Sequence, residues 1–115
     1  MRVRQVIPRE AANQDIEEAI SFYLGRGAGQ AALAFIDALE QAYRHIGRHP
    51  ASGSNRYAHE LDLPGLRSWP LRRYPYLIFY LELDNHIDVW RVLHQHRDIP
   101  VWLDEDGNAE EIASN

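Results

Sequence analysis

Two closely spaced pairs of histidines in this 115-residue chain could bind a metal ion or take part in catalysis. His45 and His49 are four residues apart, so on a helix they would share one side and could bind a metal ion. A structural zinc site needs about four ligands, and neither a cysteine nor a convergent acid accompanies this pair. We therefore interpret both as residues near a helix C-terminus, where histidine meets unpaired carbonyls, and we expect no metal site.

A second pair, His94 and His96, would share one face of a strand, with Asp98 close behind. Because imidazole titrates near neutral pH, these residues could bind a metal or act in acid–base catalysis. The alternative is a strand end whose polar side chains face solvent or cap the next turn. His59 and Glu60 do not form a zinc-protease motif, because Leu63 stands where the second histidine would be.

Arginine supplies all 12 basic residues of the chain. Arg67 and Arg91 lie within apolar strand-like sequence, where a guanidinium needs a carboxylate or carbonyl partner. Candidate carboxylate partners are Glu60, Asp62 and Asp88. For each arginine, an internal ion pair and a functional role both remain open. The sequence contains no nucleophilic triad, phosphate-binding loop or dinucleotide fingerprint.

The composition narrows the function classes. The net charge is −5, but five acids lie in the last twelve residues, and the other residues carry 12 basic and 12 acidic side chains. A neutral domain is poorly suited to phosphate contacts, so we expect no direct nucleic-acid binding. The chain has no cysteine, no apolar run of membrane length and no signal-peptide pattern at its N-terminus. We expect a cytoplasmic protein without cofactors.

Apolar periodicity predicts the elements that position these residues. Two amphipathic helices, over about 11–25 and 30–47, are joined by a glycine-rich turn. Strands are predicted over 2–8, 57–63, 66–74, 76–83 and 86–94. The strand 66–74 is expected either at an edge or with a bulge at Trp69–Pro70, and 76–83 in the centre of the sheet. The order β-α-α-β-β-β-β predicts an α+β fold: a helical hairpin packed on a mostly antiparallel sheet of four to five strands. We expect one domain over 1–103 and an acidic, flexible tail over 104–115.

Three stretches of the strand half resemble a known family. They are Leu66-Arg67-Ser68-Trp69-Pro70, then Arg73 through Tyr80 (RYPYLIFY), then Ile87 through Asp98 (IDVWRVLHQHRD), and the His49–Gly53 loop is similar too. Together with the order of elements they resemble the ParE-type toxins of the RelE/ParE toxin–antitoxin superfamily, over about residues 3–103.

The resemblance implies one of two activities. RelE-like members are ribosome-dependent mRNA endonucleases, whereas ParE-like members poison DNA gyrase. Where RelE-like chains open a strand with arginine, this chain has Tyr76, and it contains no lysine. Arg97 matches a RelE-type arginine by position, and Trp102 stands near the place of a C-terminal tyrosine. We therefore favour the ParE branch and assign no catalytic residue, while the alternative endonuclease would use His94, His96 and Arg97.

Membership also implies partners. The toxin would bind the gyrase A subunit, and an antitoxin would neutralise it by wrapping a flexible C-terminal segment around helix and sheet surfaces, in a hetero-oligomer. Candidate binding residues for antitoxin or target are Arg67, Arg91, Arg97 and Trp102. A third reading is a toxin-fold protein without toxicity that only binds an antitoxin-like partner.

Overall fold

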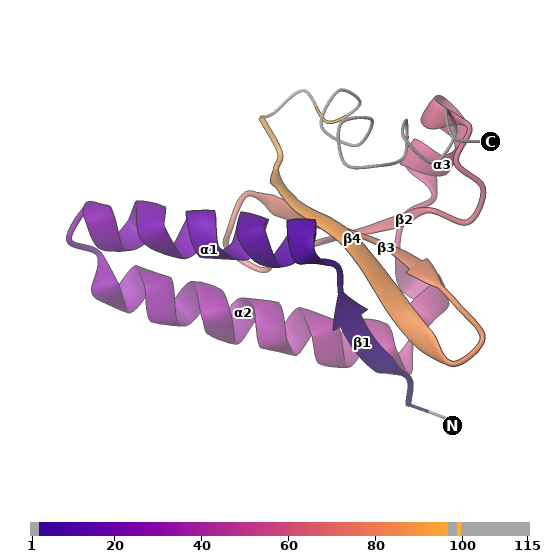
Figure 1. The fold of residues 1–115 in the computed structure, drawn as a ribbon, viewed down its shortest axis with the longest axis horizontal. Coiled ribbons are helices and arrows are strands. Elements are labelled where there is room, and N and C mark those ends of the chain that lie inside the picture. The colour runs from indigo at the N-terminus through magenta and orange to yellow at the C-terminus, as the bar shows by residue number, and fades with distance from the viewer. Residues whose placement is uncertain (1–2, 97–98, 100–115) are drawn as a thin grey trace.

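The computed structural model of the chain describes residues 3–96 and residue 99. Figure 1 shows two long helices lying side by side, with their connecting turn reaching past the sheet. The elements are, in order, β1 (Gln5–Pro8), α1 (Glu10–Gly25), α2 (Gly29–Arg48), the short 3-10 helix η1 (Pro50–Ser52), α3 (Arg56–Leu61), β2 (Arg67–Pro70), β3 (Tyr76–Glu82) and β4 (His86–His94).

The four strands form one sheet in the order β1–β4–β3–β2. β3 pairs antiparallel with β2 and β4, and β1 pairs parallel with β4. The predicted α+β class, a helical hairpin on a mostly antiparallel sheet, is thus confirmed. β3 has a strand on each side, as its apolar sequence predicted, and β2 lies at the edge of the sheet, where Pro70 is tolerated.

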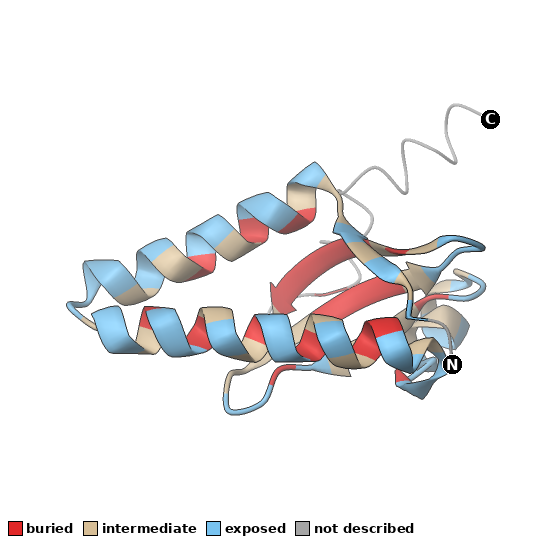
Figure 2. Cartoon of the chain, turned by 90° about the horizontal axis from the view of Figure 1, so that it is seen from below, coloured by how far each residue is buried: buried red, intermediate tan, exposed pale blue. Residues whose placement is uncertain are grey.

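The main core lies between the hairpin and the sheet. Both helices are amphipathic, and Figure 2 shows buried positions recurring along them and filling the central strands. Phe35 and Ile46 of α2 and Ile78, Tyr80 and Val89 of the sheet are fully buried in this cluster. Such a core accounts for the pairing of the two helices, because each buries its apolar side against the same sheet.

One predicted element is wrong. The segment 57–63, expected as a strand, forms α3 instead, and Asp62 ends that helix in the left-handed conformation with φ 53°. The apolar residues Tyr57, Ala58 and Leu61 recur at helical spacing and pack on the sheet face that lies away from the hairpin. Six residues give too little periodicity to distinguish a short helix from an alternating strand.

This second sheet face has an apolar core of its own. Leu66, Phe79, Trp90, Leu93 and Ile99 are buried there, and side chains of α3 pack against them. Both faces of the sheet are therefore covered, the first by the hairpin and the second partly by α3.

Candidate functional site

A groove of about 520 Å³ runs between α1 and the C-terminal end of β4. We call it the α1–β4 groove. Most of its walls are apolar or aromatic, and Phe22 is 50% exposed. A concave apolar surface with an exposed aromatic side chain is suited to binding part of another protein. Its walls include Ala19, Phe22 and Tyr23 of α1, Tyr76 of β3, and Val92 and His94 of β4.

The groove exists because β1 is shorter than β4. The ladder between them ends at the pair Pro8–Val89, after which the Arg9 N–H donates to the Val89 carbonyl and α1 begins. Beyond that point α1, rather than a strand, runs beside β4. The carboxylate of Asp15 accepts the backbone N–H of Val92 at 3.0 Å, and so takes the place of a strand partner.

The same carboxylate holds Arg91 in a buried ion pair. Two guanidinium nitrogens of Arg91 donate to the two Asp15 oxygens, each at 2.7 Å, and the two side chains are 9% and 8% exposed. This bidentate geometry joins α1 to β4 at the base of the groove. The sequence left two roles open for Arg91, a binding residue or a member of an internal ion pair. The structure shows the internal ion pair.

The partner of Arg91 was not among the predicted acids. Glu60 pairs with Arg56, and Asp88 pairs with Arg9. The sequence signal for Asp15 is its place on the apolar side of α1, three residues after Ala12 and four before Ala19. An acid at a buried helical position needs a buried donor.

His94 and His96 lie close together, with ring centroids 5.1 Å apart, and His94 also packs edge-on against Tyr76. The Nδ1 atom of His94 accepts the backbone N–H of His96 at 3.1 Å. A neutral His94 therefore carries its proton on Nε2, which makes it a poor general base in this arrangement. The other predicted residues of this region, Arg97, Asp98 and Trp102, lie outside the described residues.

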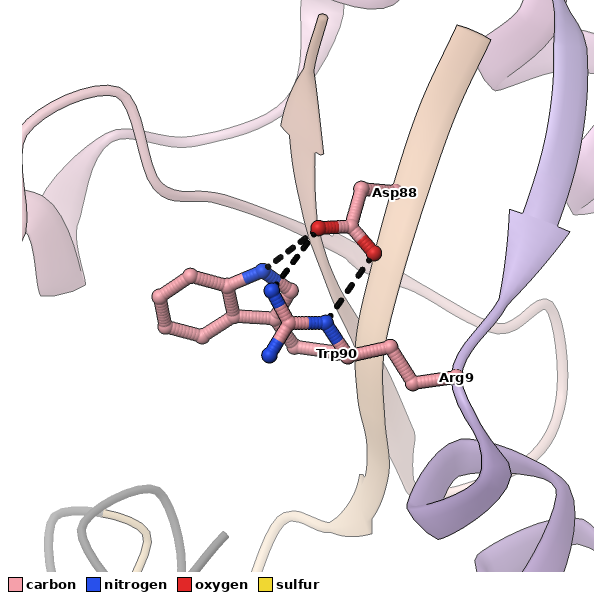
Figure 3. A network of polar contacts seen from close by, with 3 residues as sticks. All are labelled: Arg9, Asp88 and Trp90. Atoms are coloured by element: carbon pink, nitrogen blue, oxygen red, sulfur yellow. Dashed lines mark hydrogen bonds and ion pairs between the residues drawn. The ribbon is translucent and has the colours of Figure 1, made fainter. Parts of the chain in front are cut away.

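A second polar network lies on the opposite sheet face. The Arg9 guanidinium donates two hydrogen bonds to Asp88, at 2.9 and 3.1 Å, and lies 4.8 Å from the ring centre of Trp90. Figure 3 shows that the Trp90 indole N–H also points to Asp88, at 3.2 Å. In these contacts the polar groups of the three side chains hydrogen-bond to one another. They also connect Arg9, just before α1, to β4.

Arg67 also has an internal partner. It donates to the carbonyl of Gly53 at 2.8 Å, while the Tyr80 hydroxyl donates to the Pro50 carbonyl and accepts the Gly53 N–H. Burial raises the pKa of Tyr80, although the Gly53 hydrogen bond opposes that effect. The partner of Arg67 is thus a backbone carbonyl, one of the two kinds expected, and not one of the candidate acids; its contacts hold the loop after α2 against the sheet.

The ring centroids of His45 and His49 are 5.2 Å apart. The His45 ring, however, stacks on Trp69 with a centroid distance of 4.2 Å, and its Nε2 atom is 3.1 Å from the Ser52 hydroxyl oxygen. Within residues 3–96 and 99, no three histidine or acidic side chains are grouped so that they could hold a metal ion.

Comparison with known proteins identifies the family. A family model described as the ParE toxin of the type II toxin–antitoxin system, parDE, matches residues 6–99. The chain belongs to the ParE toxin family. A solved structure described as the chromosomal ParDE TA system from P. aeruginosa has a similar fold, with a TM-score of 0.66 and 16% identity over 80% of this chain and 96% of that chain. The family predicted from the sequence is confirmed.

A search of curated proteins found no significant match to this ParE-family chain. No helix in its described part has the length and apolar character that crossing a membrane requires.

Proposed function

We propose that this chain is the toxin of a type II toxin–antitoxin pair, that it acts in the cytoplasm by binding DNA gyrase, and that a cognate antitoxin neutralises it. The observation that carries this proposal is the match of residues 6–99 to the ParE toxin family. The described geometry supports a role in protein binding, because the α1–β4 groove is mostly apolar and Phe22 in its wall is exposed to solvent.

The chemistry of the described residues also favours binding over catalysis. RNA cleavage requires a base, an acid and a cation that stabilises the transition state. The Nδ1 lone pair of His94 is engaged by a backbone N–H, and Arg91 is held by Asp15. On the sheet face opposite the hairpin, the apolar side chains of Leu66, Phe79 and Leu93 are buried and supply no catalytic group. These features support the gyrase-directed reading over the endonuclease.

The α1–β4 groove is the surface that we assign to the antitoxin. A flexible segment gains affinity by placing apolar side chains in a groove, and this groove borders both helix and sheet. Phe22 and Leu24 offer a matched test, because both are exposed on α1 but only Phe22 lines the groove. Phe22→Ser should weaken antitoxin binding by about tenfold, which corresponds to 1.4 kcal/mol, and Leu24→Ser should leave it within threefold. Equal losses would contradict the assignment.

The function itself is tested with the purified chain freed from antitoxin, assayed beside gyrase and beside translating ribosomes. We expect inhibited supercoiling, accumulation of cleaved DNA and intact mRNA. Cut mRNA with unaffected gyrase would replace the proposal with the endonuclease reading. No effect in either assay, together with antitoxin binding, would leave a non-toxic binding protein. Adding antitoxin should abolish the gyrase effect.

A further inference from the structure

A second groove lies between α2 and the connection from β2 to β3. Two adjoining cavities of about 530 and 430 Å³ share Ala38, Gln41 and Arg72 as lining residues. We call their union the α2–β2 groove. Tyr74 lines it and packs against Tyr23 and Phe35, so this aromatic cluster separates it from the α1–β4 groove.

The groove is open because α2 presents small side chains to it. Ala34, Ala38 and Ala42 all line it, and their spacing of four residues places them on one side of the helix. Trp69 lies at one part of the opposite wall and Tyr74 at another. A chain segment could therefore approach the backbone of α2 closely and contact aromatic rings on the other wall.

Arginine dominates the rim. Arg72 and Arg73 are exposed and, among the described residues, neither has an acid within ion-pair distance. Arg48, also exposed, follows Gln41 by seven residues and so lies on the same side of α2, whereas Arg44 lines a cavity toward β1. Among the described residues that line the groove, Asp37 is the acid.

The backbone at Arg73 points to a role for its side chain. Its φ of 72° is in the left-handed region, where glycine or asparagine is favoured and a long side chain is uncommon. A strained backbone at an exposed turn motivates a search for function, although it does not identify one. The unpaired charge at the rim of a groove supplies the second observation.

The charge distribution favours one kind of occupant. The exposed acids Glu10, Glu17 and Glu18 lie along α1, which contains no basic residue. On α2, by contrast, Asp37 and Glu40 are balanced by Arg44 and Arg48, and the β2–β3 turn adds the positive charges of Arg72 and Arg73. Because opposite potentials on one small domain orient a charged partner, an acidic segment would be drawn to the α2 side and repelled from the α1 side. Nucleic acid is disfavoured, since the whole chain carries a net charge of −5.

We propose that the α2–β2 groove binds an acidic segment of the antitoxin, with carboxylates paired to Arg72 and Arg73 and with small or apolar side chains over the alanines. This inference rests on the proposed function, because it takes the antitoxin as partner. The antitoxin would then contact the toxin at two places on opposite sides of the aromatic cluster. Its apolar side chains would bind in the α1–β4 groove and its acidic segment in the α2–β2 groove.

The test measures binding of the purified antitoxin, immobilised on a sensor, to variants of the full chain. Arg72→Gln and Arg73→Gln should each weaken binding by about tenfold, and should reduce its dependence on NaCl between 0.1 and 0.5 M. Arg56→Gln, which removes an exposed charge on α3 that lines neither groove, is the matched control and should change affinity less than threefold. Ala38→Gln, which fills the part common to both cavities, should weaken binding without changing the salt dependence.

A second variant separates the Arg73 side chain from its backbone. Arg73→Gly relieves the left-handed conformation, so its urea midpoint should not fall, yet its antitoxin affinity should fall as much as that of Arg73→Gln. Wild-type affinity in Arg73→Gly, or losses in Arg56→Gln equal to those at Arg72 and Arg73, would overturn this inference and leave the proposed function standing. Absence of any binding by the unaltered chain would instead overturn the proposed function.

Discussion

Replacing Asp15 with asparagine should be among the most damaging single changes in this chain. The Asp15 carboxylate accepts two hydrogen bonds from Arg91 and one from the Val92 backbone, all within 3.0 Å. Asparagine offers one acceptor oxygen in place of two and removes the charge that balances the buried guanidinium. Removing one partner of a buried ion pair costs about 3–5 kcal/mol, a large part of the 5–15 kcal/mol that stabilises a typical domain.

Urea denaturation followed by tryptophan fluorescence measures this loss. With a slope of about 1.2 kcal/mol per molar urea, a loss of 4 kcal/mol would lower the midpoint by roughly 3 M. The comparison is the double variant Asp15→Leu/Arg91→Met, which removes both charges. It should be less destabilised than Asp15→Asn, because it leaves no buried charge unpaired and the Val92 N–H loses its acceptor at a cost of about 1–3 kcal/mol.

Two results would refute this reasoning. One is a loss below about 1 kcal/mol for Asp15→Asn, which would mean that water or a rearranged side chain replaces the carboxylate. The other is a double variant as unstable as the sum of Asp15→Leu and Arg91→Met alone, since independent effects would show that the pair does not interact energetically. Ser21→Ala, on the exposed side of α1, serves as control.

Three further predictions concern the packing around the hairpin. Tyr43→Phe should leave stability unchanged or raise it by up to about 1 kcal/mol in thermal unfolding, because the buried Tyr43 hydroxyl has no hydrogen-bond partner among the described residues. Gly53→Ala should lower stability by at least about 2 kcal/mol, since its Cβ would lie 2.3 Å from the Tyr80 hydroxyl, whereas Gly25→Ala, with nothing within 4 Å, should not. Burial raises the pKa of Tyr23, Tyr43 and Tyr80 in the folded chain, so the unfolded tyrosines ionise first and stability should fall as pH rises above about 10, by up to about 1.4 kcal/mol per pH unit for the mostly buried Tyr43. Urea titrations from pH 9 to 11.5 test this, and Tyr43→Phe should have a shallower slope; stability independent of pH there would contradict it.

Much of the fold could be predicted from the sequence because its long elements carry strong periodic signals. The apolar positions of the hairpin recur at helical spacing over 16 and 20 residues, and the predicted bounds differ from α1 and α2 by one residue at most at each end. The run from Tyr76 onward correctly indicated an inner strand. α3 was missed because six residues hold less than two helical turns.

The candidate site was less predictable because it depends on contacts between distant residues. Asp15 and Arg91 are 76 residues apart, and local sequence does not say which acid meets which arginine. Opposite Phe79 and Tyr80, β4 has a β-bulge: Val89 and Arg91 are paired, and Trp90 between them is the extra residue. No glycine, proline or other turn residue in the sequence indicates this change of register. The exposed arginines of the α2–β2 groove were not predicted as binding residues for the same reason. The sequence shows that Arg72 and Arg73 are adjacent, but it does not show that the alanines of α2 line the same groove.

Pro8 connects these features to the α1–β4 groove. It is the last residue of β1, and α1 begins right after Arg9, whose N–H donates to the Val89 carbonyl, so β1 does not continue along β4 beyond Val89. The remaining part of β4 then needs another acceptor, which Asp15 provides for Val92. A helix is wider than a strand and carries its side chains around a cylinder. It therefore leaves a groove beside β4 where further residue pairs between β1 and β4 would have closed the sheet edge. The early end of β1 therefore explains both the buried Asp15–Arg91 pair and the open surface above it.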